Sequence, residues 1–211
     1  MSAALTSRQR RKEARPAEFL AAALDVFVER GFSAARLEEI AERVGVSKGT
    51  LYLYYDSKES LFKAVVETSI VPTLAEGEAL FAAAQDDPAA LLRQLLRVWW
   101  ERVGNTPLAG IAKLMLAEAG NFPELAAYYR DNVIQRGMRL LTSTLQLGME
   151  RGVFRRHDPD LLCKVVIAPL WMASLWQCSF DLSGKGETDY AHYIEVHLDV
   201  LMGGLLQKVD E

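Results

Sequence analysis

Apolar residues recur along this chain at the three- and four-residue spacing of amphipathic helices. The first clear case is the set Leu20, Ala23, Leu24 and Phe27, which the i, i+3, i+4, i+7 spacing places on one face of a helix. No run of alternating, β-branched residues bounded by turn residues stands between such segments. The pattern therefore predicts an all-α protein.

Start and stop residues set the boundaries of these helices. Pro16, at a first helical position, begins the first helix, and Arg30-Gly31 ends it. Asp56 as N-cap, with Glu59 three residues later, predicts a capping box that opens a long helix bent by Pro72. We predict about nine helices, at roughly 16–30, 37–44, 47–54, 56–84, 86–103, 106–120, 122–152, 158–180 and 188–207, with a Gly- and Ser-rich loop at 182–187.

Composition argues against secreted and membrane classes. Cys163 and Cys178 share one apolar helical stretch, so a disulfide framework is not indicated and the reducing cytoplasm is the expected compartment. No apolar run precedes Phe19, and we expect no signal peptide. The most apolar segment, residues 161–180, is interrupted by polar residues and proline, which favours a buried packing helix over a bilayer span.

Enzyme and metal chemistry find little support. His192 and His197 are five residues apart and so do not share a helical face, and His157 lies in a predicted turn. Gly184-Lys185-Gly186 is too short for a phosphate loop and follows no strand. No acid–base pair or nucleophile stands out. We therefore predict no enzyme activity, no catalytic residues, no cofactor and no metal site.

The charge is unevenly distributed along the chain. The net charge is −4, yet residues 1–63 carry 11 Lys and Arg against 9 Asp and Glu, a balance of +2, and the remainder carries 13 against 19, a balance of −6. Positive charge at one end suits a polyanion partner there and a soluble body elsewhere. The charge asymmetry by itself does not identify that partner as a nucleic acid.

Residues 37–55, LEEIAERVGVSKGTLYLYY, have the spacing of a helix-turn-helix. Ala41 is small where two short helices must touch, and Gly45 allows positive φ in the turn between them. An ordinary helical hairpin would explain the apolar spacing equally well. The pattern turns four side chains inward (Ile40, Val44, Val46 and Leu51) and leaves five more exposed (Ser47, Lys48, Thr50, Leu53 and Tyr54).

The segments 45–52 (GVSKGTLY) and 55–62 (YDSKESLF), together with residues 21–32 and Ile40-Ala41, closely resemble the tetracycline-repressor-like (TetR) family of bacterial regulators. The specific resemblance covers residues 16–63, and within them several separated elements agree in order and spacing. It implies a three-helix DNA-binding head, a recognition helix in the major groove and a two-fold dimer on a palindromic operator in double-stranded DNA.

The resemblance assigns roles within the head. Ser47 would cap the recognition helix or meet a phosphate, Lys48 and Thr50 would face base edges or phosphates, and Gly49 would let the backbone approach the duplex. Tyr52 would donate to a phosphate, or be a half-buried packing residue. Lys58 would attract another phosphate at a helix start, or be a solvated lysine. The predicted DNA-binding residues are Arg36, Ser47, Lys48, Gly49, Thr50, Tyr52, Tyr54 and Lys58.

One position departs from the family pattern. Where family members usually have a threonine that caps the second helix, this chain has Ala35, followed by Arg36. We expect the cap to move to Ser33 and the phosphate contact to Arg36.

The predicted organisation is a basic arm at 1–15, disordered or lying in a minor groove, a DNA-binding domain at 16–62, and a ligand-binding and dimerisation domain at 63–211.

The sequence of the larger domain indicates its functional residues less specifically than the sequence of the head does. Tryptophans and methionines suit an adaptable apolar pocket or an ordinary core. An inward-facing Glu101 or Glu118 would favour a cationic or hydrogen-bonding ligand. The resemblance implies that the last two helices pair with those of a second subunit. The pocket candidates are Trp99, Val103, Met115, Glu118, Met138 and Trp176. The dimer-interface candidates are Trp171, Leu175, Ile194 and Leu201.

These observations predict a DNA-binding transcriptional regulator. The expected form is a homodimeric repressor that is released from a palindromic operator by a small-molecule effector of unknown identity, with no membrane partner. A DNA-binding accessory protein without ligand sensing is the alternative, and a helical interaction protein that has lost DNA binding is a third.

Overall fold

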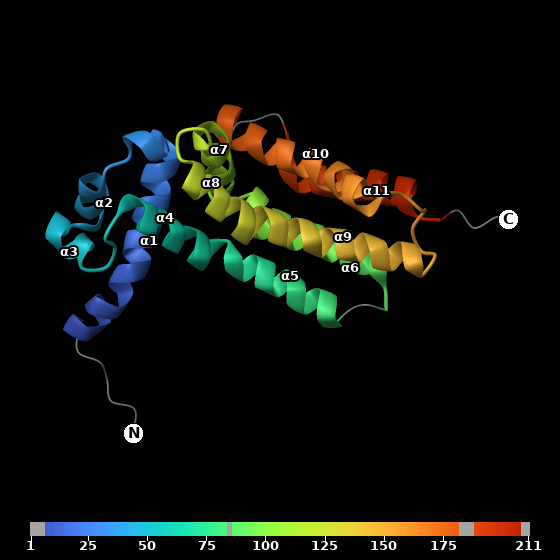
Figure 1. The fold of residues 1–211 in the computed structure, drawn as a ribbon, viewed down its shortest axis with the longest axis horizontal. Coiled ribbons are helices and arrows are strands. Elements are labelled where there is room, and N and C mark those ends of the chain that lie inside the picture. Colours follow the sequence, from blue (N-terminus) through green and yellow to red (C-terminus); the bar gives the residue numbers. More distant parts are fainter. Residues whose placement is uncertain (1–6, 84–85, 182–187, 208–211) are drawn as a thin grey trace, which may run out of the picture.

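Helices account for almost all of the computed structural model, which describes residues 7–83, 86–181 and 188–207 (Figure 1). Within those ranges the one β feature is an isolated antiparallel bridge between Phe154 and Leu206. The all-α prediction is therefore confirmed. The elements are α1 (Ser7–Ala34), α2 (Leu37–Val44), α3 (Lys48–Tyr52), α4 (Lys58–Ser69), α5 (Val71–Ala83), α6 (Pro88–Trp99), the π-helical turn η1 (Trp100–Gly104), α7 (Ala109–Glu118), α8 (Pro123–Tyr129), the π-helical turn η2 (Arg130–Ile134), α9 (Gln135–Glu150), α10 (Pro159–Phe180) and α11 (Tyr190–Leu205).

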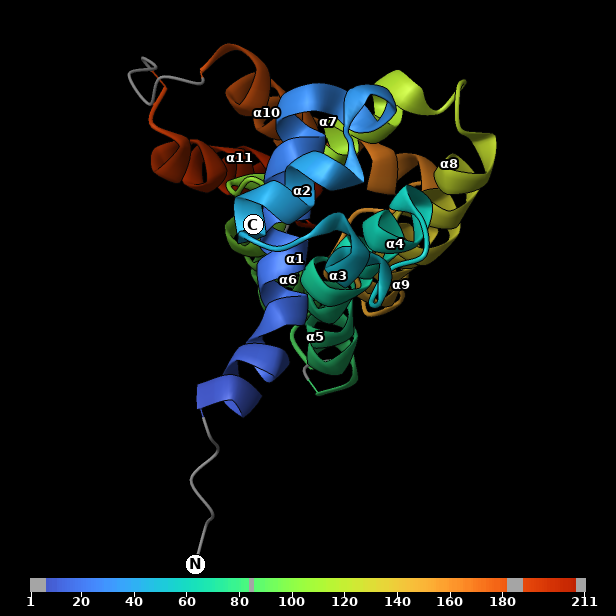
Figure 2. The ribbon, with the colours of Figure 1, turned by 90° about the vertical axis from the view of Figure 1, so that its left-hand side faces the viewer.

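The molecule has a head and a body. Helices α1, α2 and α3 lie at one end, and the long helices of the body extend away from them (Figures 1 and 2). Helix α4 packs against α1 and continues into α5 of the body. Helix α7 packs against both α1 and α10. The head is therefore joined to the body by the chain through α4 and also by side-by-side packing through α7.

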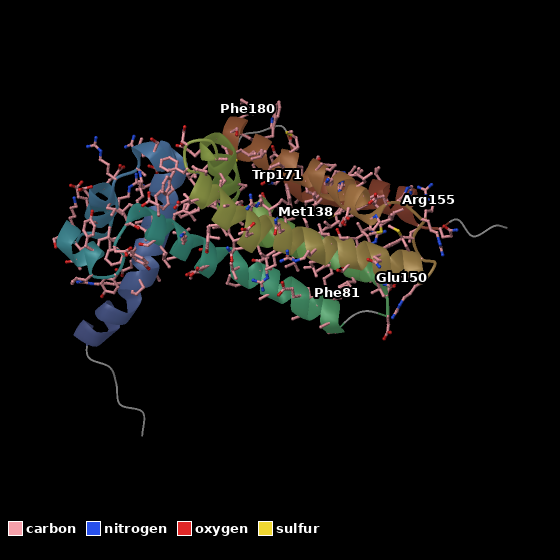
Figure 3. All side chains as sticks on the ribbon, in the orientation of Figure 1. Phe81, Met138, Glu150, Arg155, Trp171 and Phe180 are labelled. Atoms are coloured by element: carbon pink, nitrogen blue, oxygen red, sulfur yellow. The ribbon has the colours of Figure 1, made fainter. Side chains whose placement is uncertain are left out.

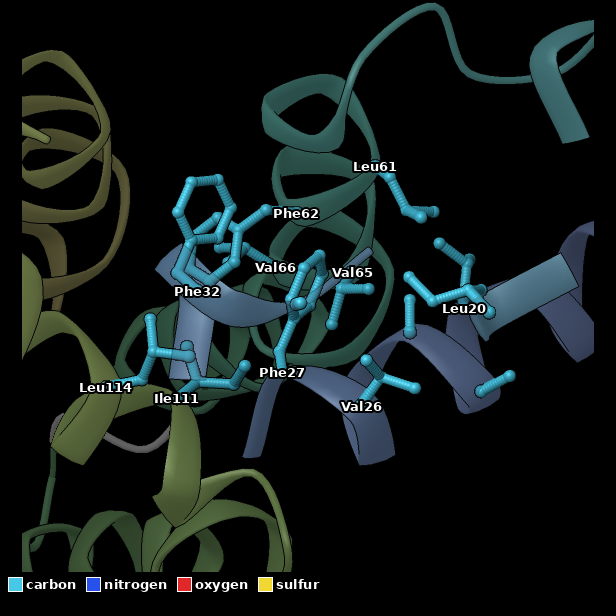
Figure 4. Close-up of a cluster of buried hydrophobic side chains, with 14 of the residues drawn as sticks. Leu20, Val26, Phe27, Phe32, Leu61, Phe62, Val65, Val66, Ile111 and Leu114 are labelled. Atoms are coloured by element: carbon cyan, nitrogen blue, oxygen red, sulfur yellow. The ribbon is translucent and has the colours of Figure 1, made fainter. Parts of the chain in front are cut away.

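Phenylalanines form the centre of the head core. Phe27, Phe32 and Phe62 are fully buried and meet edge to face or tilted, with ring centroids 5.5–5.7 Å apart. Ile111 and Leu114 of α7 reach the same cluster (Figure 4). The predicted domain boundary at 62/63 thus falls inside α4, and the head core crosses it.

The first helix differs from its prediction at both ends. It begins at Ser7, not at Pro16, so residues 7–15 of the predicted arm are helical, whereas residues 1–6 lie outside the described ranges. Arg, Lys, Glu and Ala are strong helix formers, which explains why the helix extends back past the proline. Gly31 has φ 78° and interrupts the helix where an end was predicted, but one more turn follows as far as Ala34.

Capping residues explain the other boundaries. Asp87 and Asp158 cap α6 and α10, each carboxylate accepting two backbone N–H groups. At the start of α4 the capping box was predicted one residue too early, because Ser57 and Ser60, not Asp56 and Glu59, exchange the reciprocal bonds. The Asp56 carboxylate accepts hydrogen bonds from those serines instead, which lowers its pKa.

The predicted long helix 56–84 is two helices, α4 and α5, which meet at Ile70. Pro72 has no N–H to donate to the carbonyl four residues earlier, so the helix breaks here and does not merely bend. Helices η1 and η2 are π-helical turns that continue α6 and join α8 to α9. The predicted loop 182–187 lies outside the described residues.

Candidate nucleic-acid interface and ligand cavity

The α2–α3 unit has the predicted crossing. Gly45 adopts the left-handed conformation (φ 73°, ψ 37°), and its N–H donates to the Glu42 carbonyl at 3.0 Å. Ala41 is buried at the contact of the two helices. Ile40 and Leu51 are also buried, whereas Val44 and Val46 are half-buried beside the head core. The turn residues and the inward face are therefore where the spacing placed them.

Helix α3 begins with the predicted serine cap. The Ser47 Oγ accepts the Thr50 N–H at 3.3 Å and lies 2.9 Å from the Thr50 Oγ1. The side chain of Tyr52 is 43% exposed and that of Leu53 is 83% exposed. Gly49 is exposed, and a side chain there would meet only open space and the edge of Ser47. This helix therefore presents an uncovered face at the end of the head.

Lys48 is exposed on that face but is not free. Its Nζ forms an ion pair with Glu38 of α2 and lies 5.4 Å from the centre of the Tyr52 ring. The hydrogen bond to Glu38 raises the pKa of Lys48 and lowers that of Glu38. A contact between Lys48 and DNA would require it to exchange this carboxylate for a base or a phosphate.

Lys58 has a different environment from the predicted one. Its Nζ donates to the carbonyls of Phe32, Ser33 and Ala35 at 2.6, 3.1 and 3.2 Å, and lies 4.6 Å from the centre of the Phe32 ring. An ammonium group has three N–H donors, and all three are directed to the segment formed by the last turn of α1 and Ala35, which follows it. In this structure Lys58 clasps α4 to that segment, and no donor remains for a phosphate.

Two other predicted residues also differ in detail. Ser33 does not cap α2, because the N-cap position is Arg36, whose exposed side chain makes no capping hydrogen bond. The Ser33 N–H instead donates to Glu118 Oε1 at 3.1 Å. Tyr54 is half-buried, with its ring 5.3 Å from that of Phe19, so most of it belongs to the head core.

A cavity of about 390 Å³ lies inside the body. Its lining comes from α5, α6, α7, α8, α9 and α10, with Ile70 at the junction of α4 and α5, and is almost entirely apolar. Three predicted pocket residues line it: Trp99, Val103 and Met138. Met138 and Trp171, which also lines it, come from the neighbouring helices α9 and α10 (Figure 3). The size is that of a small-molecule site.

The other three pocket candidates lie elsewhere. Met115 is buried in the head core, because α7 turns one face to the head. Glu118 lies at the end of α7, where it accepts from Ser33 and from Asn121 Nδ2 at 3.0 Å, and these bonds lower its pKa. Trp176 is exposed on α10, with its ring 4.8 Å from that of Phe180. Glu101 is also exposed, and neither glutamate lines the cavity.

The structure places the four predicted interface residues on α10 and α11 at different depths. Trp171 lines the cavity, Ile194 is buried in the body, and Leu175 and Leu201 are half-buried. Other large apolar side chains on these helices are exposed. Because apolar residues recur every three or four positions on both the inward and the outward face, the sequence could not distinguish the two faces. These side chains form the exposed stripe: Leu161, Val165, Met172, Trp176 and Phe180 on α10, and Val196 and Val200 on α11.

Helix α10 is also long and apolar enough to cross a membrane, by length and composition alone. It packs against α7, α9 and α11, and its buried residues belong to the body core. Cys163 on this helix is buried and Cys178 is half-buried, and neither forms a disulfide. Over the described ranges, no three His, Cys, Asp or Glu side chains are grouped to hold a metal ion.

A helix-turn-helix head joined by two helices to a body with an apolar cavity defines a class, the one-component DNA-binding regulator. The family model for bacterial regulatory proteins of the tetR family matches residues 19–65, and that for the tetracyclin repressor-like C-terminal domain matches residues 85–178. The HTH-type transcriptional regulator YfiR of Bacillus subtilis is 37% identical over 157 residues, which cover 70% of this chain and 72% of YfiR.

Solved structures have the same fold. The ketosteroid regulator KstR2 of Mycobacterium tuberculosis matches with a TM-score of 0.75 at 21% identity, over 92% of this chain and 96% of that one. The fatty acid degradation regulator FadR of Bacillus halodurans matches with a TM-score of 0.74 at 23% identity, over 90% and 98%. This chain belongs to the TetR family of DNA-binding transcriptional regulators, and it is not an enzyme.

Proposed function

We propose that this protein is a cytoplasmic homodimeric repressor that binds a palindromic operator and releases it when a small molecule fills the body cavity. The observation that carries the proposal is the position of Ile70. This residue directly follows α4, the helix that joins the head to the body, and it also lines the cavity. A ligand that displaces Ile70 therefore acts directly on a helix that is packed against α1.

The DNA-facing surface in this proposal is the exposed face of α3 and its surroundings. Ser47, Lys48, Gly49 and Tyr52 lie there, and Arg36 is exposed at the start of α2. Side chains at the start of a recognition helix are those that reach base edges and phosphates in the major groove. Thr50 is half-buried and bonded to Ser47, so it would act mainly by positioning the serine. Lys58 and most of Tyr54 take part in packing the head.

Two contacts besides the α4–α5 junction would carry the ligand signal. Tyr128 of α8, next to the cavity residue Tyr129, has its Oη 3.0 Å from Glu67 Oε1 of α4. Glu118 of α7 accepts the Ser33 N–H of the head. A shift of α7 or α8 around a ligand would therefore move both α4 and the end of α1.

Dimerisation would occur through the exposed stripe. The exposed stripe leaves seven large apolar side chains of α10 and α11 in water, and exposed apolar surface of this kind often marks a protein interface. A two-fold axis along this face would pair each stripe with its copy. The two α3 helices would then need to be about 34–36 Å apart, or a multiple of it, to enter successive major grooves. A change of a few ångströms in that separation would break the register.

A genomic pull-down tests this proposal. The purified protein would be mixed with sheared DNA of the source organism at moderate salt, and the retained fragments sequenced. We expect one or a few palindromic sites beside promoters, bound by a dimer. A Tyr52→Phe, Lys48→Ala double variant is the matched control, since it should lose these sites while keeping its fold. Diffuse recovery that disappears as salt rises would show only backbone attraction and would favour the accessory-protein function.

A further inference from the structure

Two buried hydroxyl groups in the cavity have no hydrogen-bond partner among the described residues. Tyr129 on α8 is 6% exposed and Ser174 on α10 is 3% exposed, and both line the cavity. No side-chain oxygen in these ranges is both fully enclosed and unpaired. The two hydroxyls must therefore reach open space, and the space that both residues line is the cavity.

Tyr129 is neutral at physiological pH, as phenols ordinarily are, and burial raises its pKa further. A hydroxyl that opens into an apolar cavity has no protein partner there, so a ligand that offers it a hydrogen bond is favoured over one that buries it unpaired. Backbone carbonyls usually satisfy such groups, as the Leu140 carbonyl does for Thr144 at 2.9 Å. Tyr129 and Ser174 are thus polar groups prepared for a molecule that is not part of the chain.

The charge of the lining limits that molecule. Among the residues that the structure describes, no Asp or Glu lines the cavity, so a cationic ligand would find no counter-ion there. Lys164 is the charged residue of the lining, and it is exposed. It precedes Ser174 by ten residues of α10, or about 15 Å along a helix. A carboxylate held by Tyr129 and Ser174 would therefore lose its hydration without a nearby cation.

We infer that the effector is an apolar, uncharged molecule whose neutral carbonyl oxygen accepts a hydrogen bond from Tyr129, from Ser174 or from both. This inference rests on the proposed function, since it takes the cavity to be the effector site. A carbonyl oxygen has two lone pairs and can accept from either hydroxyl or from both. The cavity volume of about 390 Å³ is near the lower end of the range for small-molecule sites, which suits a small effector.

Three probes of one size and shape test the inference by isothermal titration calorimetry. The ketone 2-acetonaphthone supplies the carbonyl, 2-isopropenylnaphthalene replaces it with a hydrocarbon group, and 2-naphthoate replaces it with a carboxylate. We expect the ketone to bind about 2- to 10-fold more tightly than the hydrocarbon, as one neutral hydrogen bond implies, and the anion to bind most weakly.

Tyr129→Phe and Ser174→Ala should each reduce the preference for the ketone, and the double variant should abolish it. Loss of an unpaired hydroxyl should leave the melting temperature unchanged or raise it. Tyr193→Phe is the matched control, because its hydroxyl already donates to the Pro169 carbonyl at 3.1 Å and its side chain does not line the cavity. This variant should keep the preference for the ketone.

Several results would overturn the inference: equal binding of the ketone and the hydrocarbon, no binding of any probe, or tightest binding of the anion with loss of that binding in Lys164→Met. Operator affinity is measured separately, with and without the ketone. If the ketone binds with the Tyr129-dependent preference but leaves operator affinity unchanged, the ligand chemistry is supported and the proposed sensing function is wrong.

Discussion

In the head, Phe27, Phe32 and Phe62 are fully enclosed and their rings pack against one another, whereas the body leaves large apolar side chains around a cavity and along its outer face. The head must hold a recognition helix in one orientation, and a filled core suits that requirement. The body has apolar surface in excess of its own core. Under the proposed function, a ligand covers this surface inside the cavity and a second subunit covers it outside.

The largest effect is expected from emptying the head core. Phe62→Ala should lower the free energy of unfolding by about 3–5 kcal/mol, because a fully buried ring leaves a cavity that its neighbours cannot fill. Trp171→Ala in the body should cost less, since this half-buried side chain already borders open space. Urea unfolding at one pH measures both. Equal losses would show that the body is packed as tightly as the head.

The second largest effect is expected from placing a charged residue in the exposed stripe. Met172→Asp should weaken dimerisation by about 2–5 kcal/mol, or roughly 30- to several thousand-fold in Kd, because the carboxylate would be buried without a partner. Sedimentation at several concentrations measures it. Leu116→Asp is the control, an equally large exposed apolar residue on α7 outside the stripe. A Met172→Asp protein that remains dimeric would rule out this face as the interface.

Tyr52→Phe concerns the exposed face of the head. We expect binding to the operator and to random DNA to weaken alike, by about 10- to 100-fold, since a hydrogen bond to a phosphate carries no sequence information. Fluorescence anisotropy with both DNAs measures it, and Tyr55→Phe, half-buried behind α3, serves as control. A loss confined to the operator would assign Tyr52 to base recognition.

Lys48→Ala should change which bases are preferred at defined operator positions, by about 5- to 100-fold at each. Selection from a randomised operator library measures the preference. Glu38→Gln removes the competing carboxylate and should tighten binding slightly at low salt, because Lys48 no longer has to leave an ion pair. An unchanged base preference in Lys48→Ala would exclude Lys48 from sequence readout.

The smallest effect is on the pH dependence of the body. His197 of α11 has its Nε2 3.1 Å from the Val166 carbonyl of α10, and burial lowers its pKa below 6.5. The unfolded chain therefore takes up a proton first, so stability is full above about pH 6.5 and falls as the pH drops below it. His197→Gln should flatten the fall in unfolding free energy from pH 7.5 to 5.5. The exposed His192, changed to Gln, should not.

Local signals determined the head and most helix boundaries. Gly45, Ala41 and Ser47 each have a role that follows from neighbours within a few residues, and the structure places them accordingly. The caps Asp87 and Asp158 likewise act on backbone N–H groups two and three residues later. The error at Asp56 arose because Ser57 and Ser60 offered an equivalent capping box one residue later.

Only the tertiary structure decided which side chains of a helix face the core, the cavity or the solvent. Helix α10 is apolar nearly all round, so its periodicity could not say that Trp171 faces the cavity and Trp176 faces outward. Met115 and Glu118 belong to α7, which packs against both the head and the body. Lys58 donates to three backbone carbonyls that lie more than 20 residues earlier in the chain. The sequence by itself determined the family, the all-helical fold and the recognition turn, because capping and turn chemistry act over a few residues. The cavity, the exposed stripe and the hydrogen bonds of Lys58 depend on packing between helices that are distant in the chain, and a local sequence pattern does not encode such packing.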